Sequence, residues 1–238
     1  MKHFIFFVVI QITLMSYPAF SQDSDVITDL TEKADNGDPE SQYTLGNMYY
    51  AGFNVPKDQE KGIEYLKLSA ENGHASGQAS LGYMYLQGFR VQSDLKKALK
   101  WFRYSSAQKN PYGQTGLAKM YLSGQGVRKN HELAFRLFKD SAESGDYYAQ
   151  YYLATLYATE TGTRRNYDRA YQWLLVSHFM MRSTNRFASD YDEQLITDIK
   201  KLKDGMEKQM TPAHIRINKT AALRWLDNYT QQKLKDRR

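Results

Sequence analysis

The most constraining feature of the sequence is a pattern that recurs every 36 residues. Shifted by this period, the chain aligns with itself in four successive segments without a gap. The strictest columns are Gln42, Gln78, Gln114 and Gln150; Leu45, Leu81, Leu117 and Leu153; and Tyr49, Tyr85, Tyr121 and Tyr157. A fixed period of this length indicates an array of similar structural units, each packed on its neighbours.

Each unit is predicted to contain two helices. Ser41, Leu45 and Tyr49 fall at i, i+4 and i+8, on one face of a first helix that begins after Asp38-Pro39. Glycines three residues past the tyrosine column are expected to end this helix: Gly52, Gly88 and Gly124. Residues with short side chains that suit an N-cap precede the second helix: Asp58, Asp94, Asn130 and Asn166. Because one helix pair cannot bury its own apolar face, the pairs are expected to stack into a solenoid.

Two further columns bear on the packing and the turns. Small residues recur inside the first helices, where a neighbouring helix is expected to approach closely: Gly46, Gly82, Ala118 and Ala154. Lys109 replaces a glycine found in the other units, and Asn110 is expected to supply the left-handed residue there instead. Glu160 replaces another glycine, and Gly162 is expected to form that turn in its place.

The repeated pattern resembles the Sel1-like repeat, a relative of the tetratricopeptide repeat. In the second unit the pattern comprises Ala70, Gly73, Gly77, Gln78, Leu81, Gly82, Tyr85, Gly88, Val91, Asp94, Lys97, Ala98 and Trp101. The resemblance covers about residues 30–178 and implies an all-α fold, an α/α solenoid of four 36-residue helix-turn-helix repeats. The expected repeats are 34–69, 70–105, 106–141 and 142–178, after a lead-in at 22–33.

Residues 179–238 are predicted to form a C-terminal helical cap with a basic tail. One helix is expected after Ser189-Asp190, with its apolar stripe at Leu195, Ile196, Ile199 and Leu202. A last helix is expected after Thr211-Pro212, with its apolar positions at Ile215, Ala222, Trp225, Leu226 and Tyr229. Both helices are expected to pack on the fourth repeat, as terminal units of solenoids do.

The first 21 residues have the layout of a secretory signal peptide. Lys2 is followed by an apolar run, Phe4 to Met15, and Ala19-Phe20-Ser21 fits a cleavage site. The run of 12 residues is short for a bilayer crossing, so cleavage is favoured over the alternative, an uncleaved membrane tether. The expected location is the periplasm, with secretion beyond it as an alternative, and no stable membrane insertion is expected after cleavage.

Composition and motifs argue against several function classes. The chain has no cysteine, and its five histidines lie far apart, so no metal or cofactor site is predicted. Residues 182–238 carry 13 basic and 8 acidic residues, an excess too dilute for a nucleic-acid partner. Ser93 and Lys96 match the S-x-x-K motif of serine acylating enzymes, but the companion motifs are missing. We therefore predict no catalytic residues and no enzymatic activity.

The predicted function is that of an exported scaffold, or adaptor, that binds a partner protein or peptide. This is what the resemblance to Sel1-like proteins implies. In tetratricopeptide geometry, positions i, i+4 and i+7 of the first helices would line a concave groove. The candidate contact residues at these positions are Tyr43, Asn47, Tyr50, Tyr83, Lys119, Tyr151 and Thr155.

Several alternatives stay open from the sequence. The candidate side chains could instead be buried between adjacent repeats. Cysteine-rich bacterial relatives are associated with β-lactam binding or hydrolysis, although this chain lacks their cysteines. A secreted, host-directed virulence factor would differ from a periplasmic adaptor only in its destination. The sequence does not indicate an oligomeric state.

Overall fold

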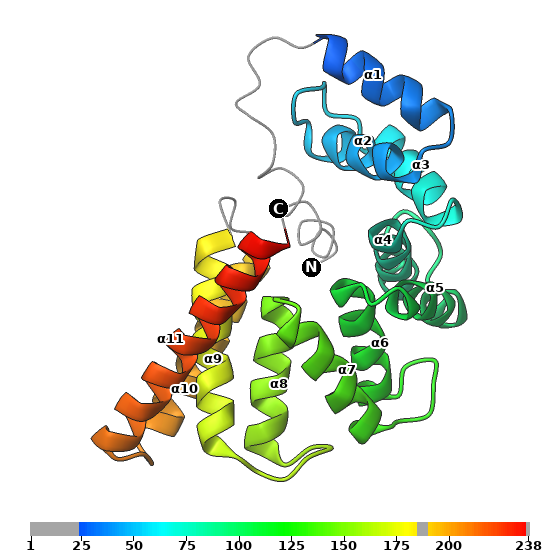
Figure 1. Ribbon diagram of the computed structural model, residues 1–238. Coiled ribbons are helices and arrows are strands. Elements are labelled where there is room, and N and C mark those ends of the chain that lie inside the picture. Colours follow the sequence, from blue (N-terminus) through cyan, green and yellow to red (C-terminus); the bar gives the residue numbers. More distant parts are fainter. Residues whose placement is uncertain (1–23, 185–189, 237–238) are drawn as a thin grey trace. The chain divides into compact units, whose positions relative to one another are not determined.

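The computed structural model describes residues 24–184 and 190–236, and every regular element within them is an α-helix (Figure 1). The expected signal peptide and Ser189 lie outside the described residues. The helices are α1 (Ser24–Asp35), α2 (Pro39–Ala51), α3 (Gln59–Glu71), α4 (Ala75–Gln87), α5 (Leu95–Ala107), α6 (Pro111–Ser123), α7 (His131–Glu143), α8 (Tyr147–Thr159), α9 (Tyr167–Thr184), α10 (Asp190–Glu207) and α11 (Pro212–Lys235). The predicted all-α solenoid is confirmed.

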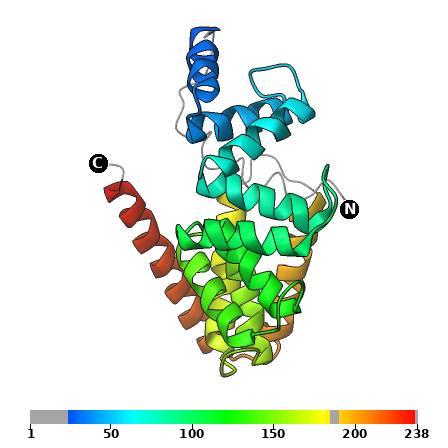
Figure 2. The same cartoon turned by 90° about the vertical axis from the view of Figure 1, so that its right-hand side faces the viewer.

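The chain divides into two compact units within α6. In unit 1, which ends at Leu117, α2 packs against α3, α4 packs against α5, and α3 contacts α4. In unit 2, which starts at Ala118, α8 packs against α7 and α9, and α11 runs alongside α9 in both views (Figures 1 and 2). Helices α10 and α11 both pack on α9, so the predicted C-terminal cap on the fourth repeat is confirmed.

The helix boundaries follow the capping residues read from the sequence. Asp38 accepts a hydrogen bond from the backbone N–H of Ser41 at 2.8 Å and so caps α2. The second helices begin at the predicted N-caps Asp58, Asp94, Asn130 and Asn166. Gly52 and Gly88 end α2 and α4 in the left-handed conformation, as predicted.

Large apolar side chains from the second helices fill the space beside the column of small residues in the first helices, which begins with Gly46 and Gly82. They occupy one column of the repeat and are fully buried: Leu66, Phe102, Phe138 and Leu174. A Cβ added to Gly46 would lie 2.6 Å from Leu66, and one added to Gly82 would lie 2.7 Å from Phe102. The close approach expected at this column therefore occurs between the two helices of one repeat.

A column of serines, not singled out from the sequence, connects the two helices of the first, second and fourth pairs. The hydroxyl of Ser69 donates to the carbonyl oxygen of Pro39 at 2.7 Å. Ser105 and Ser177 make the equivalent contact with Ala75 and Tyr147 at the same distance. The signal was present in the sequence, because serine recurs at positions 69, 105, 141 and 177.

The glutamine column links successive helix pairs. The side-chain amide of Gln78 donates to the Ala70 carbonyl at 3.4 Å and accepts from Gln108 at 2.8 Å. Gln42 makes the same contact with Ala34 in α1 at 2.9 Å. Helix α1, in the segment expected only as a lead-in, thus takes the place of the second helix of a preceding repeat.

Two sequence predictions about turns were wrong. Lys109 itself adopts the left-handed conformation, with φ of 58°, and Asn110 instead caps α6 by accepting from the N–H of Gly113 at 3.1 Å. Glu160 is also left-handed, with φ of 59°, and ends α8, although Gly162 is left-handed as well. Backbone hydrogen bonds of the repeat impose these conformations on residues that do not prefer them.

Replacing Lys109 with glycine is expected to stabilise the protein by up to about 1 kcal/mol, because glycine adopts a positive φ without steric cost. The reverse change at the equivalent site, Gly73→Lys, is expected to destabilise the protein, because Gly73 has a φ of 96°. An added Cβ at Gly73 would meet no atom within 4 Å, so the cost comes from the backbone conformation alone. Urea unfolding followed by circular dichroism measures both. A lower midpoint for Lys109→Gly would contradict the expectation.

Candidate partner-binding site

A cavity of about 1010 Å³ lies within unit 2, between α8 and the C-terminal cap. Tyr151, Thr155 and Ala158 of α8, spaced i, i+4 and i+7, form one wall. Leu202 and Met206 of α10 lie among the residues of the other wall. Two of the seven candidate residues, Tyr151 and Thr155, are therefore brought together at a cavity, on the stripe that the sequence pattern predicted.

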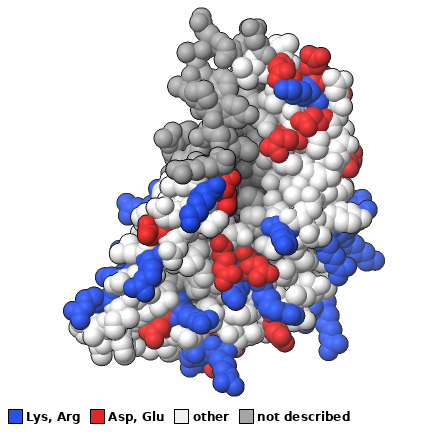
Figure 3. Space-filling model, viewed as in Figure 1, with Lys and Arg blue, Asp and Glu red and all other residues white. Residues whose placement is uncertain are grey.

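The lining combines apolar side chains with charges of both signs. Met206 and Met210 lie on the cap side, and their flexible thioethers can adapt to differently shaped side chains. Asp168 is held by the Asn218 amide at 2.6 Å, whereas Lys201 is exposed. Figure 3 shows Lys and Arg spread over the lower part of the molecule with acidic side chains among them. An apolar floor with a mixed rim suits a polypeptide segment.

Tyr151 is half-buried at the cavity wall, and its hydroxyl is uncharged at neutral pH. Burial raises the pKa of the Tyr151 hydroxyl, and the carboxylate of Asp198 raises it further. The hydroxyl of Thr155 donates to the Tyr151 carbonyl at 3.0 Å, which holds Thr155 on the same face. A neutral phenol on a helix offers both an apolar ring and a hydrogen-bonding group to a partner.

Polar and aromatic contacts hold the cap against α9. The Tyr171 hydroxyl donates to Glu207, and this bond, with help from Lys203, lowers the pKa of the Glu207 carboxyl. Trp173 and Trp225 pack edge to face, with ring centroids 5.1 Å apart. The α10 wall of the cavity is therefore fixed to the repeat array.

The four candidate residues in unit 1 are buried. Their exposed fractions are 2% for Tyr43, 6% for Asn47, 2% for Tyr50 and 7% for Tyr83. The Tyr83 ring packs edge to face on Phe102, with centroids 4.7 Å apart. This burial favours the alternative that these side chains pack between helices, and partner binding by them stays a prediction.

Two candidates have distinctive surroundings. The Lys119 ammonium lies 5.5 Å from the centroid of the Tyr152 ring, a cation–π contact within unit 2. The amide of Asn47 is covered, and neither its nitrogen nor its oxygen has a hydrogen bond with suitable geometry. Neither residue lines the cavity beside Tyr151.

The S-x-x-K segment and the candidate metal ligands can be compared with the described residues. Ser93 donates to the Leu86 carbonyl at 3.5 Å, and Asp94 caps α5, so the interpretation of this segment as a helix cap is confirmed. Over residues 24–184 and 190–236, no three His, Asp or Glu side chains are grouped as metal ligands. Within the same ranges, each helix is too short or too polar to cross a bilayer.

Two of the solved structures that resemble the chain share more than a quarter of its aligned residues. The first is c5321, a protective antigen of uropathogenic Escherichia coli with an SLR fold, at 27% identity and a TM-score of 0.67 over 87% of this chain. The second is a Sel1 repeat protein from Oxalobacter formigenes, at 27% identity and a TM-score of 0.59 over 66% of this chain. The chain spans 41% of the first protein and 65% of the second. A comparison with curated proteins gives no match.

The model of the Sel1 repeat matches four segments in succession, residues 39–74, 75–110, 111–146 and 148–175. The matches begin at the first residue of α2, α4 and α6 and one residue into α8, so they share the period read from the sequence. Together they cover more than half of the chain. The chain therefore belongs to the Sel1 repeat family.

Proposed function

We propose that this protein is an exported adaptor that binds a segment of a partner protein in the cavity of unit 2. Proteins built from Sel1 repeats are generally protein-interaction scaffolds. The proposal depends on one observation: Tyr151, Thr155 and Ala158, on one face of a first helix, line a cavity of about 1010 Å³ that the cap does not fill. A half-buried tyrosine beside adaptable methionines is typical of an anchoring site at an interface.

The shape of the lining favours a peptide segment with at least one large apolar side chain. Leu202, Met206 and Ala158 offer it an apolar surface, and Tyr151 adds a ring with a neutral hydroxyl. Backbone amides of the segment would find donors and acceptors at the rim, where Gln209 and Thr159 also line the cavity.

Export is supported by the signal-like start of the sequence, from Lys2 to Ser21. Cell fractionation with an antibody against the folded part is expected to find the shortened protein in the periplasm. Recovery from the culture supernatant would favour the host-directed alternative, and recovery from the cytoplasm would contradict export.

Site-specific photo-crosslinking tests the cavity. A photoreactive phenylalanine at Ala158 is expected to capture a discrete partner in cells, whereas the same group at exposed Tyr104 in α5 is not. Tyr151→Ala is then expected to weaken binding of the purified partner roughly tenfold, as loss of an aromatic anchor does. Unchanged capture and unchanged affinity in Tyr151→Ala, with an intact circular dichroism spectrum, would remove the cavity as the binding site.

A further inference from the structure

The second repeat begins with an unusual N-cap. The Nδ1 atom of His74 accepts a hydrogen bond from the backbone N–H of Gly77 at 3.2 Å and so caps α4. Equivalent positions in the other repeats carry Asp38, Asn110 and Asp146, which cap their helices through side-chain oxygens. Asp38 and Asn110 accept from the N–H three residues on, and Asp146 accepts from that of Tyr148. An imidazole nitrogen can serve as the acceptor only while it carries no proton.

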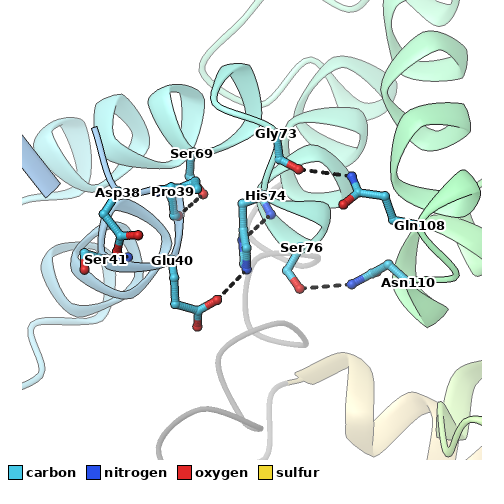
Figure 4. Close-up of polar contacts among 11 residues, drawn as sticks. Asp38, Pro39, Glu40, Ser41, Ser69, Gly73, His74, Ser76, Gln108 and Asn110 are labelled. Carbon is cyan, nitrogen blue, oxygen red and sulfur yellow. Dashed lines mark hydrogen bonds and ion pairs between the residues drawn. The ribbon is translucent and has the colours of Figure 1, made fainter. Parts of the chain in front are cut away.

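A carboxylate holds the His74 ring in the orientation that the cap requires. The Nε2 atom of His74 lies 2.9 Å from an oxygen of Glu40 in the first turn of α2, as Figure 4 shows. The Glu40 carboxylate can only accept a hydrogen bond, so the neutral ring carries its hydrogen on Nε2 and leaves Nδ1 as the acceptor for the N–H of Gly77. The positions equivalent to Glu40 are Ser76, Tyr112 and Tyr148, so this pair occurs once in the array.

The surroundings of His74 favour the neutral ring. The Tyr43 ring packs on it with centroids 4.6 Å apart, and the His74 side chain is 18% exposed. The carboxylates acting on it are Glu40 and Asp38, both from the start of α2. On the side toward α6 lie the neutral groups Ser76 and Asn110, joined by a hydrogen bond of 3.0 Å (Figure 4). Burial lowers the pKa of His74 below 6.5, and the two carboxylates offset only part of this effect.

We propose that His74 makes the start of α4 an acid-sensitive joint between the first and second repeats. Uptake of a proton at Nδ1 turns the acceptor into a donor that faces the N–H of Gly77, so the cap is lost. The imidazolium then keeps its attraction to Glu40, and the first turn of α4 is left without its side-chain acceptor. The consequence is local fraying of the first turn of α4 at low pH, while the other first helices keep their capping hydrogen bonds.

The direction of the pH effect follows from the lowered pKa. Because the unfolded chain takes up the proton first as the pH falls, the contribution of His74 to stability is complete above about pH 6.5. That contribution declines as the pH falls from 6.5 toward the folded pKa and is constant below it. Glu40→Gln removes a group that raises the pKa of His74, so the loss of the cap is expected to move to lower pH.

Hydrogen exchange of single amides in the full chain, followed by NMR, tests the joint with an internal control. The protection of the Gly77 amide, relative to its intrinsic exchange rate, is expected to fall roughly fivefold between pH 7 and pH 5, the scale of a lost N-cap. The Gly113 amide, capped by Asn110 at 3.1 Å, is expected to keep its protection. His74→Asn supplies an acceptor that does not titrate and is expected to abolish the difference.

Three results would overturn the proposal. One is equal pH dependence of protection at Gly77 and Gly113 in the natural sequence. Another is a pH dependence at Gly77 that survives in His74→Asn. The third is a ring nitrogen spectrum at pH 7 in which Nδ1 of His74, and not Nε2, carries the hydrogen. None of these measurements involves a partner, so their outcome is independent of the proposed function.

Discussion

Replacing Phe102 with alanine is expected to lower the free energy of unfolding by about 3–5 kcal/mol. The Phe102 side chain has no exposed surface and packs edge to face on Tyr83. Its ring also lies against the backbone of Gly82 and Gly116, which have no side chains that could move into the space left behind. The cavity would therefore stay open, and the full cost of lost packing would appear.

Tyr104→Ala is the matched control for Phe102→Ala, because it removes an aromatic ring from the same helix where 48% of the side chain is exposed. It is expected to cost less than about 1 kcal/mol. Urea unfolding followed by circular dichroism and by tryptophan fluorescence measures both, since repeat arrays can lose cooperativity between their units. Equal losses for the two variants would contradict the assignment of Phe102 to the core.

Gly62→Ala is expected to destabilise the protein by about 2 kcal/mol, although alanine is the residue found at the same place in the other repeats: Ala98, Ala134 and Ala170. Helix propensity alone favours alanine over glycine by about 1 kcal/mol. The structure reverses the sign, because an added Cβ at Gly62 would lie 2.7 Å from the carbonyl oxygen of Gly46 and 2.7 Å from the backbone nitrogen of Tyr50. Both are backbone atoms of a packed helix, so relief requires α2 and α3 to separate, an overpacking cost of about 1–3 kcal/mol beyond the propensity gain.

The substitution Gly205→Ala is the control that measures the effect of helix propensity on stability without a change in packing. Gly205 lies inside α10, and an added Cβ would meet nothing within 4 Å. Gly205→Ala is therefore expected to raise the free energy of unfolding by about 0.5–1 kcal/mol. Opposite signs for the two glycine variants in thermal and urea unfolding are the expected result. A stabilising Gly62→Ala would mean that the first helix pair is packed less tightly than the distances indicate.

The sequence predicted most of the fold because its signals are local and occur several times. Asp58 and Asn166 can cap a helix wherever they occur, since the cap involves residues within one turn. The 36-residue period turned each such signal into four independent observations. The sequence also placed Tyr151 and Thr155 on one face of a helix for the same reason: helical spacing alone decides which residues share a face. Binding of a partner by this face stays a prediction.

Other features depend on contacts between segments far apart in the chain, and the sequence did not predict them. Lys109 and Glu160 adopt left-handed conformations that they do not prefer, because the turns of the repeat require them at these positions. The burial of Tyr43 and Tyr50 depends on which segments pack over α2, and the spacing of residues within α2 does not predict those segments. The cavity exists only because α10 stands opposite α8, a placement that no pattern in the repeats specifies.

The glutamine relay has a consequence for how such arrays change in evolution. Gln42 and Gln78 each donate to the helix before and accept an amide from the residue that ends the helix after, so these two junctions have the same chemistry. In the later repeats the side-chain oxygens of Gln114 and Gln150 are buried without a hydrogen bond, so the two-sided contact belongs to the first two repeats. A duplication or deletion of 36 residues between these two glutamines would therefore restore the same hydrogen bonds at the new junction. Such a change would alter the number of helix pairs, and with it the extent of the surface that they present, without altering the contacts at this junction.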